Sequence, residues 1–192
     1  MLEYICEAVV LHREPNGDLD NRFSLFTKKF GKLVAKGKST RKITSKLSSH
    51  LQPGNVVSVR LIEKNGLQVV DALKKYRLTA ILSHLHFLDR ILGEAEPDQH
   101  IWQFLLEGLR WREILRVLGW DPQEALCSLC DNSKPTVFNV RNQEFFCRGC
   151  ASKLNQNDVL YIDTFDGAKL PPLGRSKSAA QCQSLREPEG FD

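Results

Sequence analysis

Two pairs of cysteines have the spacing of a metal site. Cys127 and Cys130 form one C-x-x-C pair, Cys147 and Cys150 form another, and 16 residues separate the two pairs. A two-residue gap lets both thiolates of a pair face one ion, and two pairs complete a tetrahedron of sulfur ligands. This spacing favours zinc over two coincidental pairs of buried or redox thiols. We therefore predict one structural Zn²⁺ held by these four cysteines.

The other two cysteines, Cys6 and Cys182, lie in a predicted strand and in the polar C-terminal part, and we expect neither to bind metal. The first residues lack the basic segment and apolar stretch of a signal peptide. No apolar run approaches the roughly 20 residues that span a bilayer. We therefore expect a cytoplasmic protein with no membrane partner, in which cysteines are thiols or metal ligands.

A long basic segment dominates the N-terminal part. Residues 21–62 contain ten Lys/Arg and no acid, and residues 1–75 contain 14 Lys/Arg against 7 Asp/Glu. Such asymmetry indicates an anionic partner, and a polynucleotide backbone is the natural one because each neutralised phosphate releases counterions. Phe23 and Phe30 could stack on bases, although either could equally be core. The predicted nucleic-acid-contacting residues are Lys28, Lys29, Lys32, Lys36, Lys38, Arg41, Lys42 and Lys46.

Residues 31–40, "GKLVAKGKST", nearly match a nucleotide-binding P-loop. Gly31 lies one residue too far from the closing Gly-Lys-Ser, and no strong helix follows to point its N-terminus at a phosphate. Read as a strand, the segment places Lys32, Lys36 and Lys38 on one face. We hypothesise that Lys36 and Lys38 dominate the affinity for nucleic acid. The alternative is a solvated strand face that prevents edge-to-edge aggregation.

The sequence gives little support for catalysis. It contains neither G-x-S-x-G nor G-x-G-x-x-G, and four cysteine ligands would leave a zinc ion no open position. His84 and His86 are two residues apart on a predicted helix, so they point in different directions. We predict that the protein is not an enzyme.

Five short apolar segments precede the first helical pattern, which indicates a small barrel. An OB-fold is the leading candidate, and an SH3-like barrel fits nearly as well. The expected strands are residues 4–11, 22–27, 31–38, 56–62 and 67–73.

The period then changes to that of helices, over residues 78–92 and 100–118, with Gly119 ending the second run. Between the two cysteine pairs, "TVFNVRNQEFF" reads as a hairpin with Arg141 and Asn142 at its turn. The predicted fold is α+β, with an N-terminal five-stranded OB-fold barrel followed by an α-helical domain with a four-cysteine zinc site. The expected division is a nucleic-acid-binding domain at 1–75, a helical domain with the zinc ribbon or knuckle at 76–164, and a disordered tail at 165–192.

The order of these parts resembles the bacterial RecO family of DNA repair proteins. The resemblance rests on "AVVL", on "FSLFTKKFGKLVAKGKSTRKITSKLSSHLQPGNVVSV", and on "ILRVLGWDPQEALCSLC" followed by "CRGC". The resemblance covers about residues 1–155. Its specificity comes from the combination of these motifs and not from any one of them.

The resemblance implies a recombination mediator. Such a protein binds single- and double-stranded DNA, anneals complementary strands and acts with RecR. Together they help to load RecA onto strands coated by single-stranded-DNA-binding protein. The resemblance also implies the DNA-contacting role for the eight basic residues, the zinc role for the four cysteines and a place at the bacterial nucleoid. From the residues alone, an RNA- or ribosome-associated zinc-ribbon OB-fold protein remains the alternative.

Overall fold

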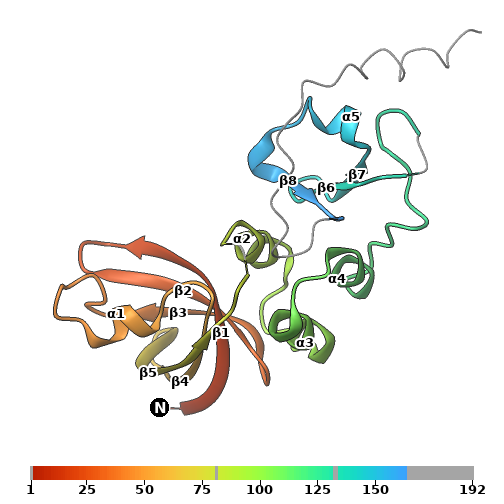
Figure 1. The fold of residues 1–192 in the computed structure, drawn as a ribbon. Coiled ribbons are helices and arrows are strands. Elements are labelled where there is room, and N and C mark those ends of the chain that lie inside the picture. Colours follow the sequence, from red (N-terminus) through yellow and green to blue (C-terminus); the bar gives the residue numbers. More distant parts are fainter. Residues whose placement is uncertain (1, 81, 132–133, 164–192) are drawn as a thin grey trace, which may run out of the picture. The chain divides into compact units, whose positions relative to one another are not determined.

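The structure is a computed structural model that describes residues 2–80, 82–131 and 134–163. The chain forms two compact units, residues 1–110 and 111–164 (Figure 1). The functional division into 1–75 and 76–164 stays a prediction, and the expected tail at 165–192 lies outside the described residues.

The first unit is built on a closed five-stranded barrel in the order β1-β2-β3-β5-β4. All neighbours are antiparallel except β3 and β5, which run parallel. The short helix α1 (Lys46–His50) connects β3 to β4. This strand order and connection confirm the OB-fold and exclude the SH3-like alternative. The strands are β1 (Leu2–Asn16), β2 (Asp20–Thr27), β3 (Gly31–Gly37), β4 (Asn55–Glu63) and β5 (Leu67–Arg77).

β1 closes the barrel because it pairs on both sides. Its residues 2–9 pair with β4 and its residues 8–16 pair with β2. The register shifts between Val10 and His12, a bulge that bends the strand from one partner towards the other.

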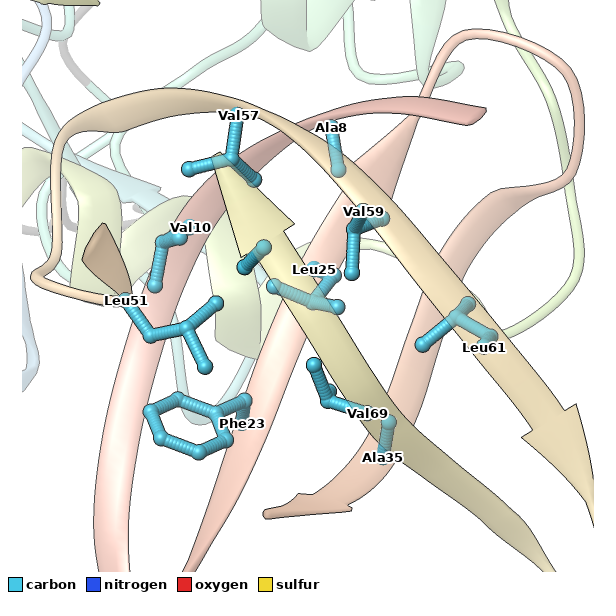
Figure 2. Close-up of a cluster of buried hydrophobic side chains, with 11 residues drawn as sticks. Ala8, Val10, Phe23, Leu25, Ala35, Leu51, Val57, Val59, Leu61 and Val69 are labelled. Carbon is cyan, nitrogen blue, oxygen red and sulfur yellow. The ribbon is translucent and has the colours of Figure 1, made fainter. Parts of the chain in front are cut away.

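The barrel interior is apolar, as the period-two pattern of the strands requires (Figure 2). Phe23 and Leu25 of β2 and Val59 of β4 are fully buried there. Leu51, directly after α1, closes one end of the core and is also fully buried. Each such side chain contributes about 1.5–3 kcal/mol by leaving water.

Two helices, α2 (Leu82–Ile91) and α3 (Gln99–Glu107), belong to the same compact unit as the barrel. The Asp98 side chain caps α3 by accepting hydrogen bonds from the backbone N–H groups of His100 and Ile101. The prediction of one helix over 100–118 is wrong. The chain leaves the helix at Gly108, whose φ of +122° is unavailable to most residues, and begins again as α4 (Trp111–Val117).

The second unit contains α4, a three-stranded sheet in the order β7-β6-β8, and the short helices α5 (Arg148–Ala151) and η1 (Gln156–Asp158). The predicted hairpin is confirmed as β6 (Val137–Asn139) and β7 (Glu144–Phe146). β8 (Val159–Tyr161) adds a third strand that the sequence did not indicate. Within the described ranges, the structure has no helix long and apolar enough to cross a membrane.

Candidate nucleic-acid interface and metal centre

The predicted DNA-contacting residues divide between the two ends of β3. Lys28 and Lys29 lie in the β2–β3 turn, before β3 begins. Lys32 is the second residue of β3, and Lys36 lies near its end. Lys38, Arg41, Lys42 and Lys46 follow in the segment 38–46, which we call the basic loop. Seven extended residues separate the two groups by about 20 Å. The structure therefore gives two basic clusters instead of one band.

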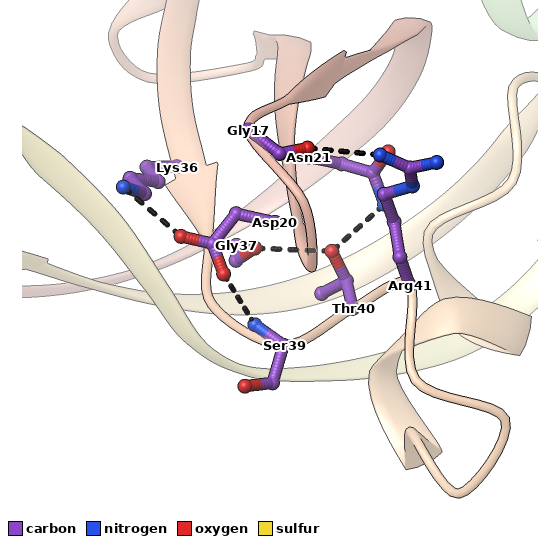
Figure 3. Close-up of polar contacts among 8 residues, drawn as sticks. All are labelled: Gly17, Asp20, Asn21, Lys36, Gly37, Ser39, Thr40 and Arg41. Carbon is purple, nitrogen blue, oxygen red and sulfur yellow. Dashed lines mark hydrogen bonds and ion pairs between the residues drawn. The ribbon is translucent and has the colours of Figure 1, made fainter.

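The basic loop is anchored to the β1–β2 turn (Figure 3). The Arg41 backbone N–H donates to the carbonyl of Leu19 at 2.9 Å, and its guanidinium donates to the carbonyl of Gly17 at 2.8 Å. Beneath them, the buried Asn21 side chain donates to Thr40 Oγ1 at 2.8 Å. In OB-folds this turn borders the face that binds oligonucleotides.

Two consecutive turns shape the rest of the basic loop. The backbone N–H of Lys42 donates to the carbonyl of Ser39 at 3.2 Å, and that of Ser45 donates to the carbonyl of Lys42 at 2.9 Å. Such bonds close β-turns. Lys38, Arg41, Lys42 and Lys46 are all exposed, so the loop presents four cations on a hydrogen-bonded frame.

Lys36 is paired with an acid that the sequence reasoning overlooked. Its ammonium lies 3.0 Å from a carboxylate oxygen of Asp20 (Figure 3). A hydrogen bond from the Ser39 backbone N–H, and secondarily the bond from Lys36, lowers the pKa of the Asp20 carboxyl. Asp20 lies just outside the acid-free segment but is the first residue of β2, which pairs with β3.

Lys32 contacts protein oxygens instead of solvent. Its ammonium donates to the backbone carbonyl of Asp89 in α2 at 2.7 Å, and its side chain is only 12% exposed. Ser24 of β2 also donates a hydrogen bond to the Asp89 carboxylate. Lys32 therefore helps to attach α2 to the barrel.

The two candidate stacking residues have different surroundings. Phe23 is fully buried in the barrel core, so the stacking hypothesis is wrong for it. Phe30 is partly exposed in the β2–β3 turn, where its ring meets Tyr4 edge-on at 5.5 Å between centroids. The Lys29 ammonium lies over the same ring, 5.3 Å from its centroid.

Lys64 is a cation that the sequence analysis did not include. It is exposed in the β4–β5 turn. Gln68 of β5 pairs with Lys36 of β3. Lys64 precedes Gln68 by four residues, so the closure of the barrel brings the β4–β5 turn towards the end of β3 that carries Lys36. Sequence could not reveal this neighbour because β3 and β5 are adjacent only through the closure of the barrel.

The four predicted metal ligands come together in the second unit. Their sulfur atoms all lie within 4.8 Å of one another, and Cys130 Sγ is 3.7 Å from Cys147 Sγ. In a tetrahedral site with metal–sulfur bonds of about 2.3 Å, sulfur atoms lie about 3.8 Å apart. All four are free thiols. The cluster can therefore hold a metal ion, and a thiolate set of this geometry fits zinc.

Local backbone geometry favours the thiolate form at one ligand. Burial by itself raises the pKa of the Cys127 thiol, but backbone hydrogen bonds at Cys147, Leu129 and Cys130 together lower it to about 7. Burial raises the pKa of the Cys150 thiol. A negative charge on the Cys127 thiolate disfavours ionisation of the neighbouring thiols. A bound cation is therefore needed for all four cysteines to ionise together.

The remaining candidates lie outside both sites. Cys6 is partly buried against the barrel core, and Cys182 lies outside the described residues. His84 is buried and His86 is exposed, as their two-residue spacing predicts. The His86 ring lies 5.1 Å from the His12 ring, a contact that sequence did not indicate.

The barrel matches a known family. Residues 1–79 match the family model described as "Recombination protein O N terminal". Over 178 residues the chain is 28% identical to the DNA repair protein RecO of Thermodesulfovibrio yellowstonii, covering 79% of this chain and 71% of that protein. Over 175 residues it is 25% identical to RecO of Bacillus subtilis, covering 77% and 69%.

Residues 1–79 match the RecO N-terminal domain, and the chain is similar to RecO proteins over most of its length. RecO of a Nocardioides species is 30% identical over 120 residues, which cover 56% of this chain. A match over 79% of the chain is much longer than the 79 residues of the family model, so the likeness to RecO extends past the barrel. The predicted RecO resemblance is therefore confirmed, and it connects the chain with DNA repair and recombination.

Proposed function

We propose that this protein is a non-enzymatic recombination mediator of the RecO kind that binds single- and double-stranded DNA through its barrel. The observation that carries the proposal is the basic loop, with four exposed cations attached to the β1–β2 turn of an OB-fold. Lys36 and Lys64 extend this surface, and Lys28 and Lys29 form a second cluster beyond the other end of β3.

The mechanism is electrostatic. Each lysine or arginine that meets a phosphate releases condensed counterions, and this gain does not depend on the base. A protein that holds backbones without reading bases leaves the Watson–Crick edges free. Two complementary strands held in this way are brought together and can pair. We propose that the protein anneals strands by this route.

The DNA-binding part is tested by salt titration. For single strands, each phosphate contact contributes about 0.7 to the slope of log K against log salt concentration. Replacing Lys38 and Lys42 by alanine should therefore reduce the slope by about 1.4. The comparison variant is Lys28→Ala with Lys29→Ala, in the second cluster at the other end of β3, which should change the slope less. If only the Lys28 and Lys29 pair changes the slope, the main interface is at that end. If neither pair changes it, the proposed DNA contact is wrong.

The mediator activity is tested by strand annealing. We propose that the protein pairs complementary strands coated by single-stranded-DNA-binding protein, and that it acts with RecR to load RecA. Fluorescence transfer between labelled strands measures annealing, with and without RecR. No acceleration over the spontaneous rate would contradict the proposal. Tighter binding to structured RNA than to single-stranded DNA would favour the RNA-associated alternative.

In the second unit, we propose that Cys127, Cys130, Cys147 and Cys150 hold one structural Zn²⁺. The tetrahedral sulfur spacing supports this, and four protein ligands leave no site for a reactive water. We also propose that the protein works in the bacterial cytoplasm at the nucleoid, where its DNA substrate is found.

A further inference from the structure

The basic loop carries one apolar side chain at its tip. Ile43 has a relative exposure of 105%, the largest among the exposed apolar residues of the described chain. Single exposed apolar residues are common on protein surfaces and need no explanation by themselves. Ile43 is unusual because its position in the loop and its charged neighbours both indicate a ligand.

The position of Ile43 is fixed by the backbone. Ile43 and Thr44 are the two central residues of the turn closed by the hydrogen bond from the Ser45 N–H to the Lys42 carbonyl. The two Arg41 bonds hold the base of the loop against the β1–β2 turn. Figure 3 shows the bond from the Arg41 guanidinium to Gly17. A side chain presented on such a frame loses little conformational entropy when it binds.

The neighbours of Ile43 define the chemistry of its ligand. Arg41, Lys42 and Lys46 are exposed on either side of it, and the loop contains no acid. A ligand that meets this surface must combine negative charge with apolar area. A nucleic-acid strand does so, because its phosphates alternate with bases whose faces are apolar. Proteins that kink duplex DNA insert isoleucine and similar apolar side chains between neighbouring base steps.

We propose that Ile43 is a wedge that enters between neighbouring bases of a DNA strand whose phosphates are held by the cations around it. This inference rests on the proposed DNA-binding function and adds a step to it. Insertion separates stacked bases, so the bound strand is held with its bases apart. Such a strand presents unstacked bases to an incoming complementary strand.

The test uses a single-stranded oligonucleotide with one 2-aminopurine between adenines, because 2-aminopurine becomes more fluorescent when it is unstacked. Full-length wild-type protein should raise the fluorescence at saturation. Ile43→Ser should remove the fluorescence rise. It should also weaken DNA binding about tenfold, because the variant loses the free energy gained by burying about half of the isoleucine side chain against the bases. It should leave the salt slope unchanged, because all cations remain. Ile43→Leu should restore the rise.

The control is Ile5→Ser, the same substitution at an isoleucine of β1 that is 71% exposed and lies outside the basic loop. It should behave as wild type, and the melting temperature of both variants should match wild type. Two results would contradict the wedge and leave the DNA-binding proposal intact. One is an Ile43→Ser variant that raises the fluorescence as much as wild type does. The other is a wild-type protein that binds the oligonucleotide without raising its fluorescence. Absence of binding by wild type would contradict the DNA-binding proposal itself. Loss of binding to phosphatidylglycerol vesicles by Ile43→Ser, with unchanged DNA fluorescence, would assign the tip to a lipid surface instead.

Discussion

At the scale of single residues, the two cations expected to dominate DNA affinity differ in their surroundings. Lys36 and Asp20 form an ion pair at 3.0 Å, whereas Lys38 is exposed and has no ion pair in the described part of the chain. The Asp20 carboxylate competes with a phosphate for the Lys36 ammonium. We therefore expect Lys38→Ala to weaken binding more than Lys36→Ala. Equal losses in a fluorescence-anisotropy titration would contradict this expectation.

Asp20 also gives the protein a pH dependence. The hydrogen bond from Ser39 and the contact with Lys36 lower the pKa of its carboxyl from the ordinary value of 3.8. The stabilisation is therefore fully present above pH 3.8 and is lost as the pH falls through the lower pKa of the folded state. Asp20→Asn should lower the melting temperature near neutral pH, and the difference from wild type should shrink as the pH falls below 3.8.

The control for this experiment is Glu14→Gln. It removes the exposed pair between Glu14 and Arg22, whose atoms are 3.7 Å apart, and surface pairs of this kind contribute little. If the Asp20→Asn difference stays constant across the titration, the carboxylate is not the source of the stabilisation.

At the scale of elements, the turn into β3 depends on glycine. Gly31 has a φ of +68°, and a Cβ at this position would overlap the backbone of Glu96. Both the conformation and the space are therefore unavailable to alanine. Gly31→Ala should reduce the free energy of unfolding by roughly 2–4 kcal/mol, measured by urea denaturation.

Gly17 provides the comparison. Its φ is +78°, but no atom lies within 4 Å of a Cβ built there. Gly17→Ala should therefore cost only the backbone strain of about 1 kcal/mol. Equal losses in the two variants would show that strain alone matters and that the Glu96 contact does not.

Sequence predicted the elements better than the contacts between them. The five strands and the 140–143 hairpin turn follow from local patterns, because a two-residue period and turn residues act over a few positions. The break at Gly108 was hidden by apolar residues that continue the helical period across it.

The contacts between elements could not be predicted in the same way. The pairing of Asp20 with Lys36 and the hydrogen bond from Lys32 to α2 depend on which strands and helices become neighbours, and local patterns do not determine this. The cysteine site was predictable because its ligand spacing alone carries the chemistry.

At the scale of the whole molecule, the two units should respond separately to metal removal. The cysteine cluster belongs to the second unit, and its apolar neighbours include Val137, Phe146 and Val159 of the small sheet. Because metal binding is coupled to the folding of such small sites, a chelator should unfold this sheet. The barrel has its own apolar core and should remain folded.

Tryptophan fluorescence and hydrogen exchange distinguish unfolding of the small sheet alone from unfolding of both units. Trp120 packs against Phe138 in the second unit, 5.4 Å between ring centroids, so its fluorescence should change when the metal is removed. Hydrogen exchange in β1 to β5 should stay slow under the same conditions. Metal analysis should give one zinc per chain before treatment. Loss of exchange protection in the barrel together with the sheet would show that the two units unfold as one.

The double pairing of β1 has a consequence for the order of folding. Leu2 pairs with Glu63, so the first strand of the barrel to leave the ribosome must wait for the fourth before the barrel can close. Its other half can pair early, because β2 follows after a short turn. Contacts between distant parts of a chain slow folding, and a half-paired strand exposes an edge that other chains can join. During synthesis, the β1–β2–β3 meander should therefore form first, and its free edge is the stage most vulnerable to aggregation.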